Sequence, residues 1–216
     1  MFTGIVQGIR KISSVSDIEG GRKLRIQLDD FSGNLEHGAS VAVNGVCLTA
    51  VKITQGWAAF DVIQETLDRS NLSDLKSGDC INIERACSYG DEVGGHHVSG
   101  HVDCIGIIKK IYNSPNNRDV VISCDKKWLA YLIPKGWITV DGVSLTVVDV
   151  GDNWFSISLI PETLKQTVLG LKAEGQKINL EFDHTVKVIV QTIERLLPEI
   201  KDNALSYLNK GGINKA

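Results

Sequence analysis

The sequence of 216 residues lacks several features that would point to whole classes of protein. Its formal net charge is only −3, and no cluster of Lys or Arg is large enough to follow a phosphate backbone, so we expect no nucleic-acid partner. No basic start leads into an apolar signal segment, and no apolar run approaches the ~20 residues of a membrane span. We therefore expect a soluble, cytoplasmic protein without a membrane partner.

Motifs for disulfides, nucleotides and metals are also missing. The five cysteines are an odd number without a CxxC pair, which argues against a disulfide framework or a zinc ribbon. No glycine-rich loop stands between a strand and a helix, so a nucleotide-binding fold is not expected. His97 and His101 are four residues apart, but the surrounding VSGHVD is typical of a strand, where such a pair would lie about 13 Å apart. No metal site is therefore expected.

What the sequence does contain is an internal repeat. VAVNGVCLT at residues 41–49 recurs as ITVDGVSLT at residues 138–146, and the same offset of 97 relates several later segments. Upstream, we align MFTGIVQGIRKI with SGHVDCIGIIKK by matching Gly8 with Gly106, an offset of 98. This period is far longer than a solenoid unit of roughly 20 to 50 residues, so each copy should be a whole small domain.

Each copy alternates apolar and polar residues, as at residues 23–28 and 155–160, which is the pattern of half-buried strands. Clusters of Gly, Asn, Asp and Ser divide each copy into about six short strands, and a closed barrel would hide their edges. Short helices are expected at residues 65–72 and 162–169, at one end of each barrel. The expected fold is all-β, with two tandem six-stranded antiparallel Greek-key barrels and a C-terminal α-helix.

The expected domains are residues 1–90 and 98–185 for the two barrels and 186–216 for a trimerisation helix and tail. The glycine-dense segment at residues 88–100 forms the connection. Pro198 predicts that the final helix kinks or ends near Leu197. Neither barrel core needs the apolar stripe of this helix, so we expect a partner subunit to cover it. The stripe consists of Val186, Ile189, Val190, Ile193, Leu196, Leu197 and Ile200.

The two copies differ mainly in polar and reactive residues. Cys47 taken alone could be a small buried thiol, and His101 could be a strand histidine with its hydrogen bonds satisfied. The presence of Ser at the position equivalent to Cys47 favours a functional difference between the copies. The pairs that differ are Cys47 with Ser144, Thr3 with His101, Asn44 with Asp141, and Ala86 with Asp183.

Four motifs in order, MFTGIV, NGVCLT, GGHHVSGHVD and VDGVSLT, closely resemble the riboflavin synthase family of the trimeric alpha type. The resemblance covers residues 1 to about 200, and it departs at Glu162, where many members have His, at Cys87 and at residues 89–93. It implies that a four-carbon unit passes between two molecules of 6,7-dimethyl-8-ribityllumazine, giving riboflavin and 5-amino-6-ribitylamino-2,4-pyrimidinedione. No metal or redox cofactor is implied.

The resemblance further implies one lumazine per barrel. The active pair would form between the N-terminal barrel of one subunit and the C-terminal barrel of its neighbour in a homotrimer. Lumazine synthase is a further candidate partner. Two other functions stay open: a non-catalytic lumazine or flavin carrier of the same fold, and a flavin-reductase-type barrel, which would need a nicotinamide-binding domain that this sequence lacks.

The matching motif positions imply which residues form the site. Histidine is the usual proton carrier at neutral pH, so His101 is the expected base, whereas Cys47 could be a nucleophile or a positioning group. The expected catalytic residues are Cys47, His101, Ser144, Ser40, Thr146 and Asp183. The expected substrate-binding residues are Met1, Phe2, Thr3, Gly4, Ile5, Val6, Cys47, Leu48, Thr49, Asp61, Val62, Ile63, Gln64, Glu65, Thr66, Gly100, His101, Val102, Lys135, Ser144, Leu145, Thr146, Ser158, Leu159, Ile160, Pro161, Glu162 and Thr163.

Overall fold

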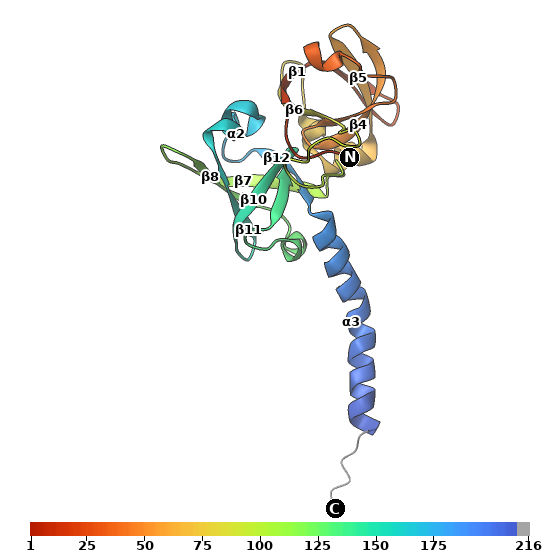
Figure 1. The fold of residues 1–216 in the computed structure, drawn as a ribbon, viewed down its shortest axis with the longest axis vertical. Coiled ribbons are helices and arrows are strands. Elements are labelled where there is room, and N and C mark those ends of the chain that lie inside the picture. Colours follow the sequence, from red (N-terminus) through yellow and green to blue (C-terminus); the bar gives the residue numbers. More distant parts are fainter. Residues whose placement is uncertain (211–216) are drawn as a thin grey trace, which may run out of the picture.

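The computed structural model describes residues 1–210 as two β-barrels followed by one long helix (Figure 1). Residues 211–216 of the expected C-terminal segment lie outside the described residues. The strands of the first barrel are β1 (Gly8–Ile18), β2 (Gly21–Gln27), β3 (Ser40–Val43), β4 (Val46–Thr54), β5 (Trp57–Ile63) and β6 (Cys80–Arg85). Those of the second are β7 (Cys104–Asn113), β8 (Arg118–Ser123), β9 (Trp137–Val140), β10 (Val143–Val150), β11 (Trp154–Leu159) and β12 (Lys177–Phe182).

Both barrels are closed and share one topology. The first has the strand order β1-β2-β5-β4-β3-β6, and the second has the equivalent order β7-β8-β11-β10-β9-β12. All of the strand pairs are antiparallel. Because β2 lies beside β5 instead of β3, the chain follows a Greek-key path. The predicted fold class is therefore confirmed.

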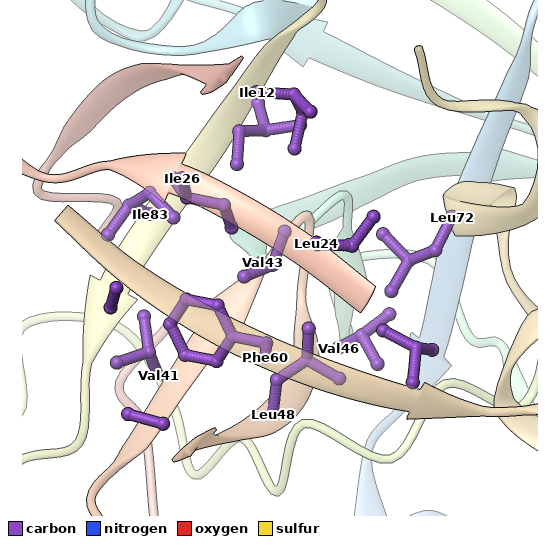
Figure 2. Packing of buried hydrophobic residues seen from close by; sticks show 14 of the residues in the cluster. Ile12, Leu24, Ile26, Val41, Val43, Val46, Leu48, Phe60, Leu72 and Ile83 are labelled. Carbon is purple, nitrogen blue, oxygen red and sulfur yellow. The ribbon is translucent and has the colours of Figure 1, made fainter. Parts of the chain in front are cut away.

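The alternating pattern of the sequence fills the barrel interiors. In β2 the side chains of Leu24 and Ile26 are fully buried, while Arg25 between them is exposed. Figure 2 shows Leu24 and Ile26 among the apolar side chains that surround Phe60 of β5 in the first core. Truncating such a side chain, as in Phe60→Ala, typically costs about 3–5 kcal/mol of stability.

The predicted helices at residues 65–72 and 162–169 are each shorter than expected. The structure has α1 (Gln64–Arg69) followed by a 3₁₀ turn, η2 (Asn71–Asp74), and α2 (Pro161–Gln166) followed by η4 (Val168–Gly170). Ser70 and Thr167 are extended and separate the two pieces. Their hydroxyls donate to the carbonyl four residues earlier and also cap the 3₁₀ turn, a local alternative to continuing the helix.

A buried polar network joins the two barrels. The Asn82 side-chain amide donates to the Asp141 carbonyl oxygen at 2.8 Å, and the Asn179 amide donates to the Asn44 carbonyl oxygen at 2.8 Å. All four residues are buried, and the two contacts are related by the repeat. The barrels therefore pack around an approximate twofold axis.

Two glycines allow the barrels to approach this axis closely. Gly45 and Gly142 have φ values of +79° and +84°. A Cβ atom on Gly45 would lie 2.6 Å from the Gly142 nitrogen, and one on Gly142 would lie 2.8 Å from the Gly45 nitrogen. At the contact between Gly45 and Gly142, only glycine fits without strain. A separate contact, an isolated antiparallel bridge, joins Phe2 and Val98.

The last element, α3 (His184–Lys210), projects away from both barrels (Figure 1). It continues through Pro198, so of the two predicted outcomes, a kink or an end near Leu197, the helix does not end there. Close to the barrels, the Lys187 ammonium group contacts both carboxylate oxygens of Asp103 at 2.8 Å. Within residues 1–210, no helix is long and apolar enough to cross a membrane.

Candidate active site

The segment that leads into each barrel lies against the other barrel. The Cys47 backbone N–H in β4 donates to the Gly100 carbonyl oxygen at 2.8 Å, and the Ser144 N–H in β10 donates to the Gly4 carbonyl oxygen at 2.8 Å. Gly100 precedes β7, and Gly4 precedes β1. Each half-site is therefore assembled from both halves of the repeat.

Glycine is required at both crossings. Gly100 has φ +81°, and a Cβ on it would lie 2.6 Å from the Cys47 Cβ. Gly4 has φ +74°, and its Cβ would lie 2.6 Å from the Ser144 Cβ. Real Cβ atoms do not approach so closely, so both contacts depend on the missing side chain.

The upstream alignment with an offset of 98 is wrong. In the structure Thr3 is equivalent to Ser99, because its N–H and hydroxyl bind Glu84 in the same way as those of Ser99 bind Glu181. His101 is therefore equivalent to Ile5. That alignment matched Gly8 with Gly106 because both are glycine, but single glycines recur at unrelated positions in strands and turns.

The first half-site is a cavity of about 330 Å³ beside Cys47. It brings together residues from the predicted catalytic and binding sets. The Cys47 side chain is half-buried, and His101 is exposed. The cavity is lined by Val46, Cys47, Glu65, Thr66, Arg69, Ser70, Gly100, His101, Val102, Asp103 and Trp128.

The second half-site centres on Ser144 and on a histidine that the sequence did not single out. The Ser144 Oγ lies 2.6 Å from Nδ1 of His96, and Nε2 of His96 lies 3.2 Å from Thr139 Oγ1. The ring of His96 stacks on Trp137, with centroids 5.5 Å apart. His96 is only 4% exposed, so its ring is held in one orientation.

Burial lowers the pKa of His96 below its ordinary value, although the negative charge of Asp183 partly opposes this shift. A neutral imidazole can accept a proton at one nitrogen while it donates at the other. Asp183 has a second contact, because its Oδ1 accepts from the Val186 N–H at 3.0 Å and caps α3. Asp183 therefore caps the start of α3 and also acts through its charge on His96.

The surroundings of Cys47 and Ser144 differ as much as the residues themselves. Thr139 and Trp137 on β9 are equivalent to Ala42 and Ser40 on β3. The first half-site thus has a thiol beside the exposed His101. The second has a hydroxyl bonded to the buried His96, so the two sites offer different chemistry.

The other predicted residues that the structure places lie in the barrel cores, at the strand-to-helix junctions and in β3, β10 and the turn before β9. Several side chains point into the cores, so only their backbone groups could meet a ligand. These are Phe2, Leu48, Val62, Leu145 and Leu159. Others lie where β5 and β11 lead into α1 and α2, at residues 61–66 and 158–163. Ser40 pairs with Thr49, Thr146 pairs with Trp137, and Lys135 lies in the turn before β9 with φ +68°.

Sequence reasoning missed His96, Trp128, Arg69 and the two buried glutamates Glu84 and Glu181. The clearest available signal was the doublet of His96 and His97, of which only His96 is buried. The glutamates recur in both copies, each two residues after an asparagine in a short strand, and a buried charged residue needs a partner. Trp128 and Arg69 reach the cavity only through tertiary packing.

Comparison with solved structures supports the fold. The chain is similar to LumP in complex with riboflavin, with a TM-score of 0.80 and 24% identity over 85% of this chain and 100% of LumP. The complex of LumP with 6,7-dimethyl-8-(1'-D-ribityl) lumazine gives a TM-score of 0.77 over the same coverage. At this level of identity the likeness supports the fold alone.

Sequence comparison is more specific. The lumazine binding domain family matches residues 3–86 and again residues 99–183. Riboflavin synthase of Escherichia coli (strain K12) is 43% identical over 208 residues, which cover 95% of this chain and 97% of the relative. Riboflavin synthase of Mycobacterium bovis is 41% identical over 201 residues, with 91% and 98% coverage. The chain therefore belongs to the riboflavin synthase family and contains two lumazine-binding domains in tandem.

Proposed function

We propose that this chain catalyses the riboflavin synthase reaction, in which two molecules of 6,7-dimethyl-8-ribityllumazine give riboflavin and 5-amino-6-ribitylamino-2,4-pyrimidinedione. One observation carries the proposal beyond family membership: a single chain holds two related half-sites with different reactive groups. Two identical substrates must take opposite roles in this reaction, so a duplicated but chemically unequal site suits it. Because one molecule donates the four-carbon unit that the other accepts, no external redox cofactor is required.

The reaction needs a base to remove a proton from the acidic C7 methyl group of one lumazine and a nucleophile to add at C7 of the other. In the first half-site we assign proton transfer to His101, with Cys47 as the adjacent thiol. In the second, a neutral His96 would accept the hydroxyl proton of Ser144 at Nδ1 and make its oxygen more nucleophilic. Holding two rings in a fixed orientation can contribute roughly 7–11 kcal/mol in favourable cases.

We also propose a homotrimer in which α3 forms the contact between subunits. The apolar side chains of Ile189, Ile193 and Leu197 are all more than half exposed, which is costly for a helix that stands free of its own barrels. The active pair of lumazines would then form between the first barrel of one subunit and the second barrel of its neighbour. A cytoplasmic location and a complex with lumazine synthase remain predictions.

A direct assay tests the proposed function. Purified protein is incubated with 6,7-dimethyl-8-ribityllumazine and no added cofactor, and riboflavin is followed by absorbance. We expect one riboflavin for every two lumazines consumed, together with one pyrimidinedione. Tight binding without turnover would contradict the proposal and favour a non-catalytic carrier.

A further inference from the structure

We infer that Glu84 and Glu181 are positioning residues for the reaction, because each fixes a glycine that forms the wall of the half-site in the other barrel. Glu84 lies on β6 of the first barrel, and Glu181 lies on β12 of the second. Neither contacts the reacting groups described above. The inference rests on the proposed function, but part of its test does not require turnover.

Glu181 holds the segment that contains His101. Its Oε1 accepts from the Ser99 N–H and the Ser99 hydroxyl, both at 2.7 Å, and its Oε2 accepts from the Gly100 N–H at 3.0 Å. The Ser99 hydroxyl oxygen in turn accepts from the His101 N–H at 3.1 Å. A continuous chain of hydrogen bonds therefore connects the carboxylate with the proposed base.

Glu84 makes the same contacts in the other half. Its Oε1 accepts from the Thr3 N–H at 2.6 Å and the Thr3 hydroxyl at 2.8 Å, and its Oε2 accepts from the Gly4 N–H at 3.1 Å. The Thr3 hydroxyl oxygen accepts from the Ile5 N–H at 3.2 Å. The arrangement is thus kept in both copies, although the residue after each glycine differs.

Each carboxylate controls a contact with the opposite barrel. The carbonyl of Gly100, held by Glu181, accepts from Cys47 N–H, and the carbonyl of Gly4, held by Glu84, accepts from Ser144 N–H. A shift of either glutamate would therefore move a glycine across the face of the neighbouring reactive residue. Misplacement by about 1 Å can cost about 100-fold in rate.

A carboxylate is chemically suited to this task, since it has two oxygens and no donor. Glu84 and Glu181 are only 3% and 5% exposed, so each is buried at a cost that its three hydrogen bonds offset. Burial raises the pKa of both groups, and the bonds to Thr3 and Ser99 oppose that rise. Glutamine has the same shape, but its NH₂ group would face a backbone N–H.

The test compares full-length Glu181→Gln and Glu84→Gln with the wild type. We expect kcat to fall at least about tenfold in each variant, while KM changes less than about threefold and the far-UV spectrum and subunit mass are unchanged. Glu19→Gln, the same change at an exposed turn residue, is the matched control and should keep the wild-type kcat.

A second measurement distinguishes a local movement of Gly100 beside Cys47 from a destabilisation of the whole protein. The rate at which a thiol reagent labels Cys47, followed by peptide mapping, should rise at least about fivefold in Glu181→Gln and stay within twofold of the wild type in Glu84→Gln. Equal acceleration in both variants, or an unchanged kcat at saturation, would overturn the inference. If either Gln variant fails to fold, Ser99→Ala and Thr3→Val each remove the hydroxyl that donates to the glutamate and accepts from the N–H two residues on, and they should give the same pattern, with at least about threefold effects.

If the proposed function were wrong, the experiments would give a different set of results. Wild-type protein would then form no riboflavin from lumazine, yet the labelling of Cys47 would still respond to Glu181→Gln alone if the positioning role is correct. The two ideas can therefore be rejected separately.

Discussion

The Ser144 hydroxyl lies 2.6 Å from Nδ1 of His96, inside the second half-site. The equivalent residue in the first barrel, Cys47, is surrounded differently, because Ala42 and Ser40 occupy the positions of Thr139 and Trp137. The duplication has therefore kept the shape of the two sites while changing their acid–base groups. This asymmetry is the basis of the proposed division of roles between the two lumazines.

The first prediction concerns the residues of the first half-site. Cys47→Ser or His101→Gln should lower turnover at least about tenfold, equivalent to roughly 1.4 kcal/mol in the barrier, and change ligand affinity only a few-fold. A loss confined to the transition state is what a catalytic role requires. Absorbance gives the rate, and fluorescence titration with riboflavin gives the affinity.

Cys87→Ser is a suitable control, because Cys87 is a half-buried thiol outside this cavity. It should retain wild-type turnover. Poor binding with normal turnover at saturation in the first two variants would make Cys47 and His101 binding groups and contradict the assigned roles.

The second prediction concerns the pH dependence of stability. Burial lowers the pKa of His96 in the folded state, so the unfolded chain binds the proton more readily. The stability that the neutral ring contributes is present above the unfolded value of about 6.5 and is lost as pH falls toward the folded pKa. Between pH 7.5 and 5.5, His96→Gln should lose less unfolding free energy than the wild type.

Urea denaturation at a series of pH values provides the measurement. His37→Gln removes an exposed histidine that is not among the groups acting on His96 and should keep the wild-type slope. If His96→Gln and wild-type protein show the same slope, His96 is not held in its neutral form by burial.

The third prediction tests the approach of the two barrels. Gly45→Ala would place a Cβ 2.6 Å from the Gly142 nitrogen at a φ of +79°, so both backbone strain and a collision with the other barrel should destabilise the fold. Gly56→Ala has a similar φ of +86° but no neighbour within 4 Å. We expect about 1–2 kcal/mol for Gly56→Ala from strain alone and clearly more for Gly45→Ala.

Denaturant unfolding of both variants measures the difference. Similar losses at the two positions would mean that the barrels can separate without cost, which would contradict the tight packing around Gly45 and Gly142.

The fourth prediction concerns α3. Removal of residues 188–216 keeps Lys187 and its contact with Asp103 but deletes most of the exposed apolar stripe, so the proposed trimer should dissociate into folded monomers. Sedimentation gives the mass, and circular dichroism reports the barrels. Removal of residues 211–216 alone leaves the stripe intact and should leave the mass unchanged. A trimer that survives the longer truncation would show that other surfaces hold it together.

Much of the fold is encoded locally. The period-two pattern of β2 and β11 specifies which side chains enter a core, and the repeat of residues 41–49 at 138–146 implies two copies of one domain. The helix lengths were harder to predict, because the hydroxyls of Ser70 and Thr167 bind backbone groups that a longer helix would have used. Pro198 predicted a kink or an end, and the helix does not end there, since a helix can continue past a proline with the loss of one hydrogen bond.

By itself the sequence determined the fold class and the duplication, because these depend on the periodicity and the repetition of residues along the chain, whereas the catalytic roles of Cys47, Ser144 and His101 stay predictions. Only the tertiary structure decided that Gly100 and Gly4 cross to the opposite barrels, that Thr3 is equivalent to Ser99, and that His96 belongs with Ser144. These relationships depend on contacts between residues far apart in the chain. Hydrogen bonds to Glu84 and Glu181 and the close approach of glycine backbones set them, and neither leaves a periodic signal in the sequence.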